Sequence, residues 1–356
     1  MLRFFLISFI LFSTGRHSCG QEPRRDSTRS PHSVKILPVP ALGYAPETGF
    51  YIGAVSLFTF DLYRDSFSRI SNAKVEFNYT WKKQVILEAG WNYFFRRERW
   101  FTRGLLRYSE YPDLYFGVGP NTPESYELQY MSERWVADVD MLRNLGSRVF
   151  AGPRVRYLDY RHVHYEEKPL FPELVSSVSW GAGYTVLKDS RDNLLNATRG
   201  VYLEWSNTFD RAGGRTYSKF YADARVYTTP FAGTVAALRI YNELSPGDPP
   251  FFDYALFGGD KLARGYFYGR FREKNLFLVQ SEIRQHIWRR IGLAVFGGAG
   301  NLYPDLQKLS LAHLKPNYGA GIRFLADRKE RINLRLDYGM GTGGQSGFFI
   351  AFGESF

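Results

Sequence analysis

The chain has 356 residues and a formal net charge of +11, and 44% of its residues are hydrophobic and 17% aromatic. Its lysines and arginines are dispersed instead of gathered into a patch, so no nucleic-acid partner is expected, and anionic lipid head groups or a wet channel wall are favoured. Beyond residue 12 no stretch approaches the roughly 20 continuous apolar residues of a membrane helix. Alternating strands are the remaining way to cross a membrane.

The first segment has the pattern of a secretory signal peptide. A short basic start at residues 1–3 precedes an apolar stretch at 4–12, and the small residues that follow predict cleavage after Gly20. The single cysteine, Cys19, lies in this segment, so a mature chain would contain no disulfide and no reactive thiol. The alternative is a lipoprotein with its lipid on Cys19, although the residues before it match that processing site poorly.

Residues 21–35 are polar and rich in arginine, and they are too short to fold as a domain. We therefore expect a signal peptide at 1–20, a flexible periplasmic leader at 21–35 and one domain at 36–356. The texture of the sequence does not change within that last range.

The clearest strand pattern lies at 73–81, where apolar and polar residues alternate and the apolar positions are Ala73, Val75, Phe77, Tyr79 and Trp81. Because successive side chains on a strand point to opposite faces, this pattern predicts one face toward lipid and one wet face. The alternation recurs along the chain and predicts about sixteen strands, an even number as in single-chain outer-membrane barrels. Their approximate ranges are 39–45, 50–60, 70–82, 84–96, 99–109, 126–143, 147–162, 174–187, 199–209, 216–229, 232–244, 275–287, 290–300, 314–326, 330–341 and 345–354, with 232–244 and 290–300 ambiguous in facing.

The expected fold is thus all-β: a transmembrane, antiparallel, up-and-down β-barrel in the outer membrane of a Gram-negative bacterium. Outer-membrane lipid and lipopolysaccharide are its expected surroundings. With the N-terminus in the periplasm, the short turns should be periplasmic, at 144–146, 230–231 and 288–289. The long connections should be external loops, at 110–125, 163–173, 245–274 and 301–313.

The final residue, Phe356, follows Phe348, Ile350 and Phe352 at even spacing. We expect it to end the last strand. A terminal aromatic residue is characteristic of outer-membrane barrels, so Phe356 is also expected to act as an assembly signal.

Four segments carry recognisable motifs in a fixed order. They are Asp-Ser-Arg-Asp-Asn-Leu-Leu-Asn-Ala-Thr-Arg-Gly-Val-Tyr at 189–202, Gly-Gly-Asp-Lys-Leu-Ala-Arg-Gly-Tyr at 258–266, Phe-Gly-Gly-Ala-Gly-Asn at 296–301 and Leu-Arg-Leu-Asp-Tyr-Gly at 334–339. Together they resemble the bacterial surface antigen superfamily, the barrels of outer-membrane protein assembly and two-partner secretion transporters. In that comparison 189–202 matches a periplasmic turn and the strand after it. The segment 258–266 matches the Arg-Gly-aromatic motif of the long sixth external loop.

The resemblance implies that this loop folds back into the barrel, with Arg264 pairing with an acidic residue on a late strand. Asp337 is the best partner, and Glu282 is a second candidate. Gly265 would permit a tight turn, and Tyr266 would pack the loop tip against the wall. The alternation at 332–338 independently predicts that Asp337 faces the lumen. The alternatives are a solvated Arg264, and an Asp337 that belongs to a general lumen network with Arg335.

Members of this superfamily usually carry polypeptide-transport-associated domains before the barrel, where this sequence has only the leader 21–35. We therefore expect a periplasmic or lipoprotein partner. The favoured function is polypeptide insertion or translocation at the outer membrane. A passive pore or uptake channel is the main alternative, and an adhesin or structural barrel is a third.

The sequence predicts no enzyme, no cofactor and no metal site. His162 and His164 share a strand face, but at a barrel rim such histidines are expected to be solvated. Ser281 and His286 differ in strand parity, so they cannot form the hydrogen-bonded pair that a hydrolase needs.

Overall fold

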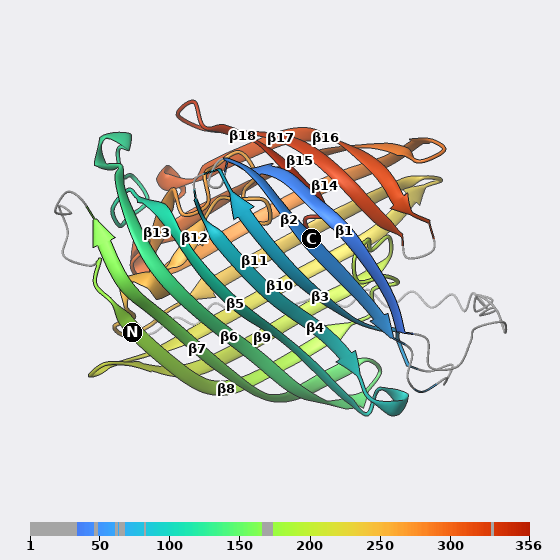
Figure 1. Ribbon diagram of the computed structural model, residues 1–356, viewed down its shortest axis with the longest axis horizontal. Helices are drawn as coiled ribbons and strands as arrows, with labels where there is room; N and C mark the ends of the chain where they lie inside the picture. The colour runs from blue at the N-terminus through green and yellow to red at the C-terminus, as the bar shows by residue number, and fades with distance from the viewer. Residues whose placement is uncertain are drawn as a thin grey trace, which may run out of the picture.

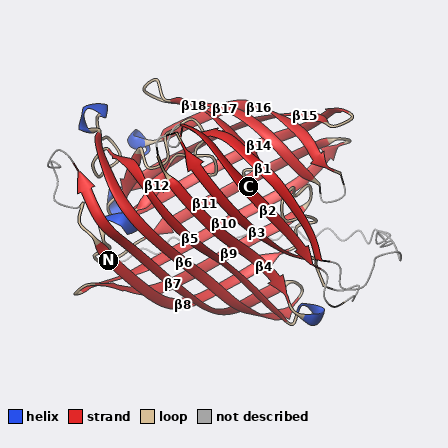
Figure 2. Cartoon of the chain, viewed as in Figure 1, coloured by secondary structure: helices blue, strands red, loops and turns tan. Residues whose placement is uncertain are grey.

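A computed structural model describes residues 34–45, 49–60, 63, 68–81, 83–165, 174–328 and 331–356. The expected signal peptide and nearly all of the leader lie outside these ranges. Sixteen strands form one sheet in which each strand pairs antiparallel with its neighbour in the chain, except that a two-stranded hairpin is inserted between β11 and β14. The strands are tilted and wind round until β18 lies beside β1 (Figure 1). Figure 2 shows that strand dominates the described chain and that the few helical turns lie toward the ends of the barrel. The prediction of an all-β barrel of about sixteen strands is confirmed.

The strands of the large sheet are β1 (Val34–Ala45), β2 (Gly49–Phe60), β3 (Ser71–Thr80), β4 (Val85–Phe94), β5 (Trp100–Tyr115), β6 (Leu128–Gly146), β7 (Val149–Tyr165), β8 (Ser177–Asp189), β9 (Gly200–Ala212), β10 (Arg215–Phe231), β11 (Thr234–Leu244), β14 (Asn275–Trp288), β15 (Ile291–Tyr303), β16 (Lys315–Asp327), β17 (Ile332–Gly341) and β18 (Ser346–Phe352). The inserted hairpin is β12 (Ala255–Phe257) with β13 (Phe271–Glu273). No helix among the described residues is long and apolar enough to cross a membrane.

Two of the expected turns lie inside strands. β10 continues through Pro230 to Phe231, and the ladder shifts register between Thr228 and Phe231, which accommodates a residue that has no N–H to donate. β6 continues to Gly146, and the reversal falls on Ser147 and Arg148, both with positive φ. The remaining expected turn, 288–289, begins on the last residue of β14. We refer to the end of the barrel with these short connections as the turn end.

The two faces of the strands separate as the alternation predicts. The side chain of Phe77 is 47% exposed on the outer surface, whereas Asn78 beside it is 7% exposed and faces inward. The facing of 232–244 was ambiguous from sequence, and the structure settles it. Leu238 and Ile240 face outward, and Arg239 between them is buried.

The interior is packed and contains the long connection 245–274. Its apolar side chains form a buried cluster with the inner wall of β14 and β15, made of Ala255, Phe257, Ala263, Tyr266, Phe271, Leu276, Leu278 and Leu302. The apolar side chains of this loop thus cover the inner surface of the wall. The hairpin within the loop was not predicted, because its strands have three residues each and form only when the loop is folded inward.

The end of the chain also turns inward, contrary to expectation. β18 ends at Phe352, and Gly353, with a φ of +79°, redirects the backbone. Phe356 is therefore not on the strand. Its ring is 6% exposed and packs against Ala197, Tyr227 and Ala237.

Candidate functional site

The tip of loop 245–274 places one arginine against the inner wall. Arg264 is 1% exposed. Its Nη1 donates to Asp337 Oδ2 at 2.6 Å, and its Nη2 donates to Glu282 Oε2 at 2.5 Å. The guanidinium also lies over the ring of Phe296, 3.5 Å from the ring centroid. The structure thus brings Arg264 together with both acidic residues named from the sequence, on β17 and β14.

The two residues after Arg264 fix the path of the tip. Gly265 has a φ of +115°, and a Cβ there would lie 2.6 Å from the Met340 backbone, so only glycine fits this close approach. Tyr266 is completely buried. Its hydroxyl donates to the Pro316 carbonyl at 2.9 Å and accepts from the backbone N–H of Thr342 at 2.8 Å. These contacts join the loop tip to β16 and to the turn after β17.

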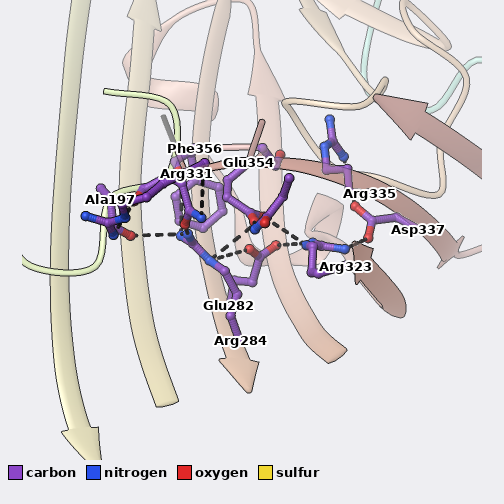
Figure 3. A network of polar contacts seen from close by, with 12 residues as sticks. Ala197, Glu282, Arg284, Arg323, Arg331, Arg335, Asp337, Glu354 and Phe356 are labelled. Carbon is purple, nitrogen blue, oxygen red and sulfur yellow. Dashed lines mark hydrogen bonds and ion pairs between the residues drawn. The ribbon is translucent and has the colours of Figure 1, made fainter. Parts of the chain in front are cut away.

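The Arg264 contact belongs to a larger group of paired charges, which we call the latch layer, and all of their side chains are buried except that of Asp260. Arg323 Nη1 donates to Asp337 Oδ1 at 2.5 Å, and Arg335 Nη1 donates to Asp337 Oδ2 at 2.8 Å. Arg284 Nε lies 2.9 Å from Glu282 Oε1 (Figure 3). The layer balances four cations against four anions: Arg264, Arg284, Arg323, Arg335, Asp260, Glu282, Asp337 and Glu354.

Balance within the layer is needed because buried charges must be paired. The attraction between two buried ions offsets the free energy cost of removing them from water only when their geometry is good and further hydrogen bonds satisfy their remaining donors and acceptors. Removing one partner of such a pair typically destabilises a protein by about 3–5 kcal/mol. Strand parity predicted that Asp337 faces the lumen, but it could not show which other charges of the layer lie at the same height.

The inward-turned end of the chain joins the latch layer from the turn end. Glu354 accepts from Arg323 Nε at 2.9 Å and from Asn333 Nδ2 at 2.6 Å. Its backbone N–H donates to the Leu195 carbonyl at 3.1 Å, in the turn between β8 and β9. Ser355 Oγ donates to the Asp260 carbonyl of the loop tip at 2.8 Å. Segment 353–356 therefore lies between the loop tip and this turn.

The turn between β8 and β9 is itself ordered by a carboxylate. Asp192 Oδ1 accepts from the backbone N–H groups of Thr198 and Arg199 at 2.8 and 3.1 Å. Arg331 donates to Oδ2 at 2.8 Å. Partial burial alone would raise the pKa of Asp192, but these hydrogen bonds outweigh it and lower the pKa to about 2.

A second buried contact, which the sequence did not predict, holds the same loop nearer its start. Asp253 lies in a short 3-10 turn (Phe251–Asp253) and is 5% exposed. Its Oδ1 accepts from Arg156 Nη2 at 2.8 Å, and its Oδ2 accepts from the Tyr217 hydroxyl at 2.6 Å. Lys219 Nζ donates to the Asp253 carbonyl. No motif marks Asp253, because its partners lie on β7 and β10, far away in sequence.

Residues considered for a metal do not converge. His162 has a positive φ, and its Nδ1 lies 2.8 Å from Glu133 Oε2 on the exposed rim. Among the residues that the structure describes, no group of three or more His, Cys, Asp or Glu side chains could hold a metal ion.

The fold and the site define a class of protein: an antiparallel transmembrane barrel with one of its own loops held in the lumen by buried charge pairs. A family model described as the Omp85 superfamily domain matches residues 60–356. The chain belongs to the Omp85 superfamily, and it is an outer-membrane β-barrel of the Gram-negative type. This is in line with the resemblance found in the sequence.

Two solved structures share the fold at low sequence identity. The crystal structure of BamA from Haemophilus ducreyi lacking POTRA domains 1–3 has a TM-score of 0.57 and 12% identity, over 90% of this chain and 70% of that chain. CdiB from Acinetobacter baumannii has a TM-score of 0.55 and 12% identity, over 90% of this chain and 65% of that chain. No curated protein sequence matches the chain.

Proposed function

We propose that this barrel handles polypeptides at the outer membrane, in insertion or translocation, with a periplasmic or lipoprotein partner. In this proposal the latch layer holds loop 245–274 inside the lumen in the resting state. Arg264, Asp337 and Glu282 form the latch, and Gly265 and Tyr266 set the position of the tip.

The observation that carries the proposal is the burial of Arg264 between two carboxylates, Asp337 of β17 and Glu282 of β14. Arginine suits this role because its planar group makes two directed bonds at once and stays charged at any relevant pH. Membership of the Omp85 superfamily supports a role at the level of insertion or translocation. The competing function is a passive pore, and the burial of the loop tip inside the barrel argues against a permanently open one.

The test of the latch is a double-mutant cycle with Arg264→Ala, Asp337→Ala and both together. Each single change strands a buried charge and should raise both channel conductance in planar bilayers and protease cleavage of loop 245–274. The double variant should be less affected than the sum of the two single variants, because each single change already breaks the bond between Arg264 and Asp337. Lys261→Ala is the matched control, since it also removes a positive charge from the loop tip and leaves the Arg264 contacts intact.

The polypeptide role needs a separate measurement. Liposomes containing the wild-type barrel should accelerate the membrane insertion of a urea-unfolded outer-membrane protein relative to empty liposomes. A stable, ion-selective open channel without any such acceleration would favour the passive pore.

In the double-mutant cycle, strictly additive effects of Arg264→Ala and Asp337→Ala would show that the loop is not held by this pair.

A further inference from the structure

A cavity of about 560 Å³ opens at the turn end, next to the latch layer. Two of its lining residues, the buried Arg284 and Arg323, also belong to that layer. Its other charged walls come from the turns β8–β9, β14–β15 and β16–β17. The cavity is therefore reached from the end of the barrel that the short turns predict to be periplasmic.

The charged residues that line this cavity are mostly cationic. Five arginines contribute to it, and its single carboxylate is Asp192, which Arg331 already binds at 2.8 Å. Arg199 and Arg290 are both exposed, and no ion pair engages either guanidinium within the described ranges of the chain. Two cations with no acidic partner thus face a cavity that opens to solvent.

The structure shows which kind of group these two arginines bind. Arg323 Nε binds the Glu354 carboxylate at 2.9 Å, and Arg284 Nε lies 4.0 Å from it. Glu354 reaches them from a segment outside any strand, whose backbone N–H bonds to the Leu195 carbonyl at 3.1 Å. Arg323, which lines the cavity, thus already binds an acidic side chain on an irregular stretch of polypeptide (Figure 3).

We propose that this cavity is a docking site for an acidic, extended segment of another polypeptide, whose carboxylates bind Arg199 and Arg290. The carboxylates of the bound segment would then lie farther from the latch layer than the carboxylate of Glu354. Such a segment would contact both the β8–β9 turn and the cavity wall beside Arg284 and Arg323. Its binding site therefore adjoins the latch layer of the proposed function but does not include Arg264.

A polypeptide fits better than a lipid head group because of where the cavity lies. Arg284 and Arg323 point inward, and their side chains are 7% and 4% exposed, so these two cations of the lining do not face lipid. The lining also includes the exposed hydrophobic residues Ile291 and Leu293. Polar uncharged groups on Thr229, Gln285 and Asn333 also line the cavity and can bond to a peptide backbone, and apolar side chains such as Val235 and Leu325 can contact its side chains.

The experiment measures binding of a fluorescein-labelled peptide of alternating glutamate and threonine to the purified full chain in zwitterionic detergent, by fluorescence anisotropy. The double variant Arg199→Glu, Arg290→Glu should weaken the affinity by about tenfold or more, as expected when two charge-assisted contacts become repulsive. The wild-type affinity should fall as salt is added. A peptide of alternating lysine and threonine should not bind.

The matched control is Arg143→Glu, Arg148→Glu, which makes the same charge change in the last part of β6 and in the β6–β7 turn, at residues that do not line the cavity. If both double variants weaken binding equally, the peptide responds to general charge and the docking site is refuted. No binding of the acidic peptide, together with binding of phosphatidylglycerol micelles that the Arg199→Glu, Arg290→Glu variant abolishes, would also refute it and indicate a lipid site. The inference rests partly on the proposed polypeptide role, but the two can fail separately, since the peptide assay leaves the latch cycle untouched.

Discussion

Asp253 and Arg156 form a buried ion pair at 2.8 Å that joins loop 245–274 to β7, on the part of the wall that the latch layer does not use. Arg156 also bonds to Asp210 at 3.0 Å, and Lys219 lies between Asp253 and Glu243. The loop is thus held at two points, one near its start and one at its tip. The two points share none of their bonded residues.

This arrangement predicts that, when one of the two contact points is broken, the other still holds part of the loop in the lumen. Asp253→Asn keeps the shape of the side chain but removes its charge beside Arg156 and Lys219, and loss of one partner of a buried pair costs about 3–5 kcal/mol. We expect a modest rise in protease cleavage of 245–274 for Asp253→Asn, and a far larger rise when it is combined with Arg264→Ala. Because the sites are independent, their effects on stability should add. A combined variant no more sensitive than Arg264→Ala would mean that Asp253 has no part in holding the loop.

The facing of β3 predicts unequal tolerance to charge at neighbouring positions. Phe77→Lys places an ammonium group toward lipid and should cost about 2–4 kcal/mol if the position is near the bilayer midplane. Asn78→Lys should be far milder, because Asn78 faces the lumen and already donates to Glu76 at 2.6 Å. Urea unfolding in phospholipid vesicles gives both free energies. Equal costs at the two positions would show that the register of β3 is wrong.

The inward position of Phe356 predicts a stability effect beyond any role as an assembly signal. Phe356→Ala removes a ring that is 6% exposed and should cost about 3–5 kcal/mol, as for other buried phenylalanines. Phe352→Ala, on the outer face of β18 and 37% exposed, should cost less in vesicles. Unfolding of refolded protein tests the packing, and the yield of folded barrel in cells tests the assembly signal. If Phe356→Ala lowers only the yield, the ring does not stabilise the folded barrel.

The turn between β8 and β9 should loosen in acid. The pKa of Asp192 falls from its usual 3.8 to about 2 in the folded chain, so its stabilising effect is complete above pH 3.8. That effect is lost progressively as the pH falls from 3.8 to about 2. Backbone N–H groups of Thr198 and Arg199, which donate to Asp192, should lose hydrogen-exchange protection over this range. Asp192→Asn should lack this acid-dependent step, and an unchanged step in that variant would assign it to another group.

The sequence by itself determined the strands of the wall, their approximate number and, except at 232–244 and 290–300, their facing. A strand in a barrel wall has lipid on one side and water or protein on the other, so each strand shows its own alternation locally, as at 73–81. The sequence also placed Asp337 on the lumen face, and the motif at 258–266 placed Arg264 opposite it through a family resemblance. Strand ends were less certain, because a residue such as Pro230 signals a turn although a bulge can hold it within β10.

Only the tertiary structure decided which inward-facing charges meet. Alternation assigns a side chain to a face but says nothing of its height along the barrel or of its neighbours across the lumen. Arg156 and Asp253 are therefore unrelated in sequence, and so are Arg323 and Glu354. The inward turn at Gly353 was likewise invisible, since even spacing of aromatic residues continues through Phe352 and Phe356 whether or not the backbone leaves the sheet. Such contacts depend on the closure of the whole barrel, because the pairing energy of a buried charge is set by residues that only the complete fold brings within reach.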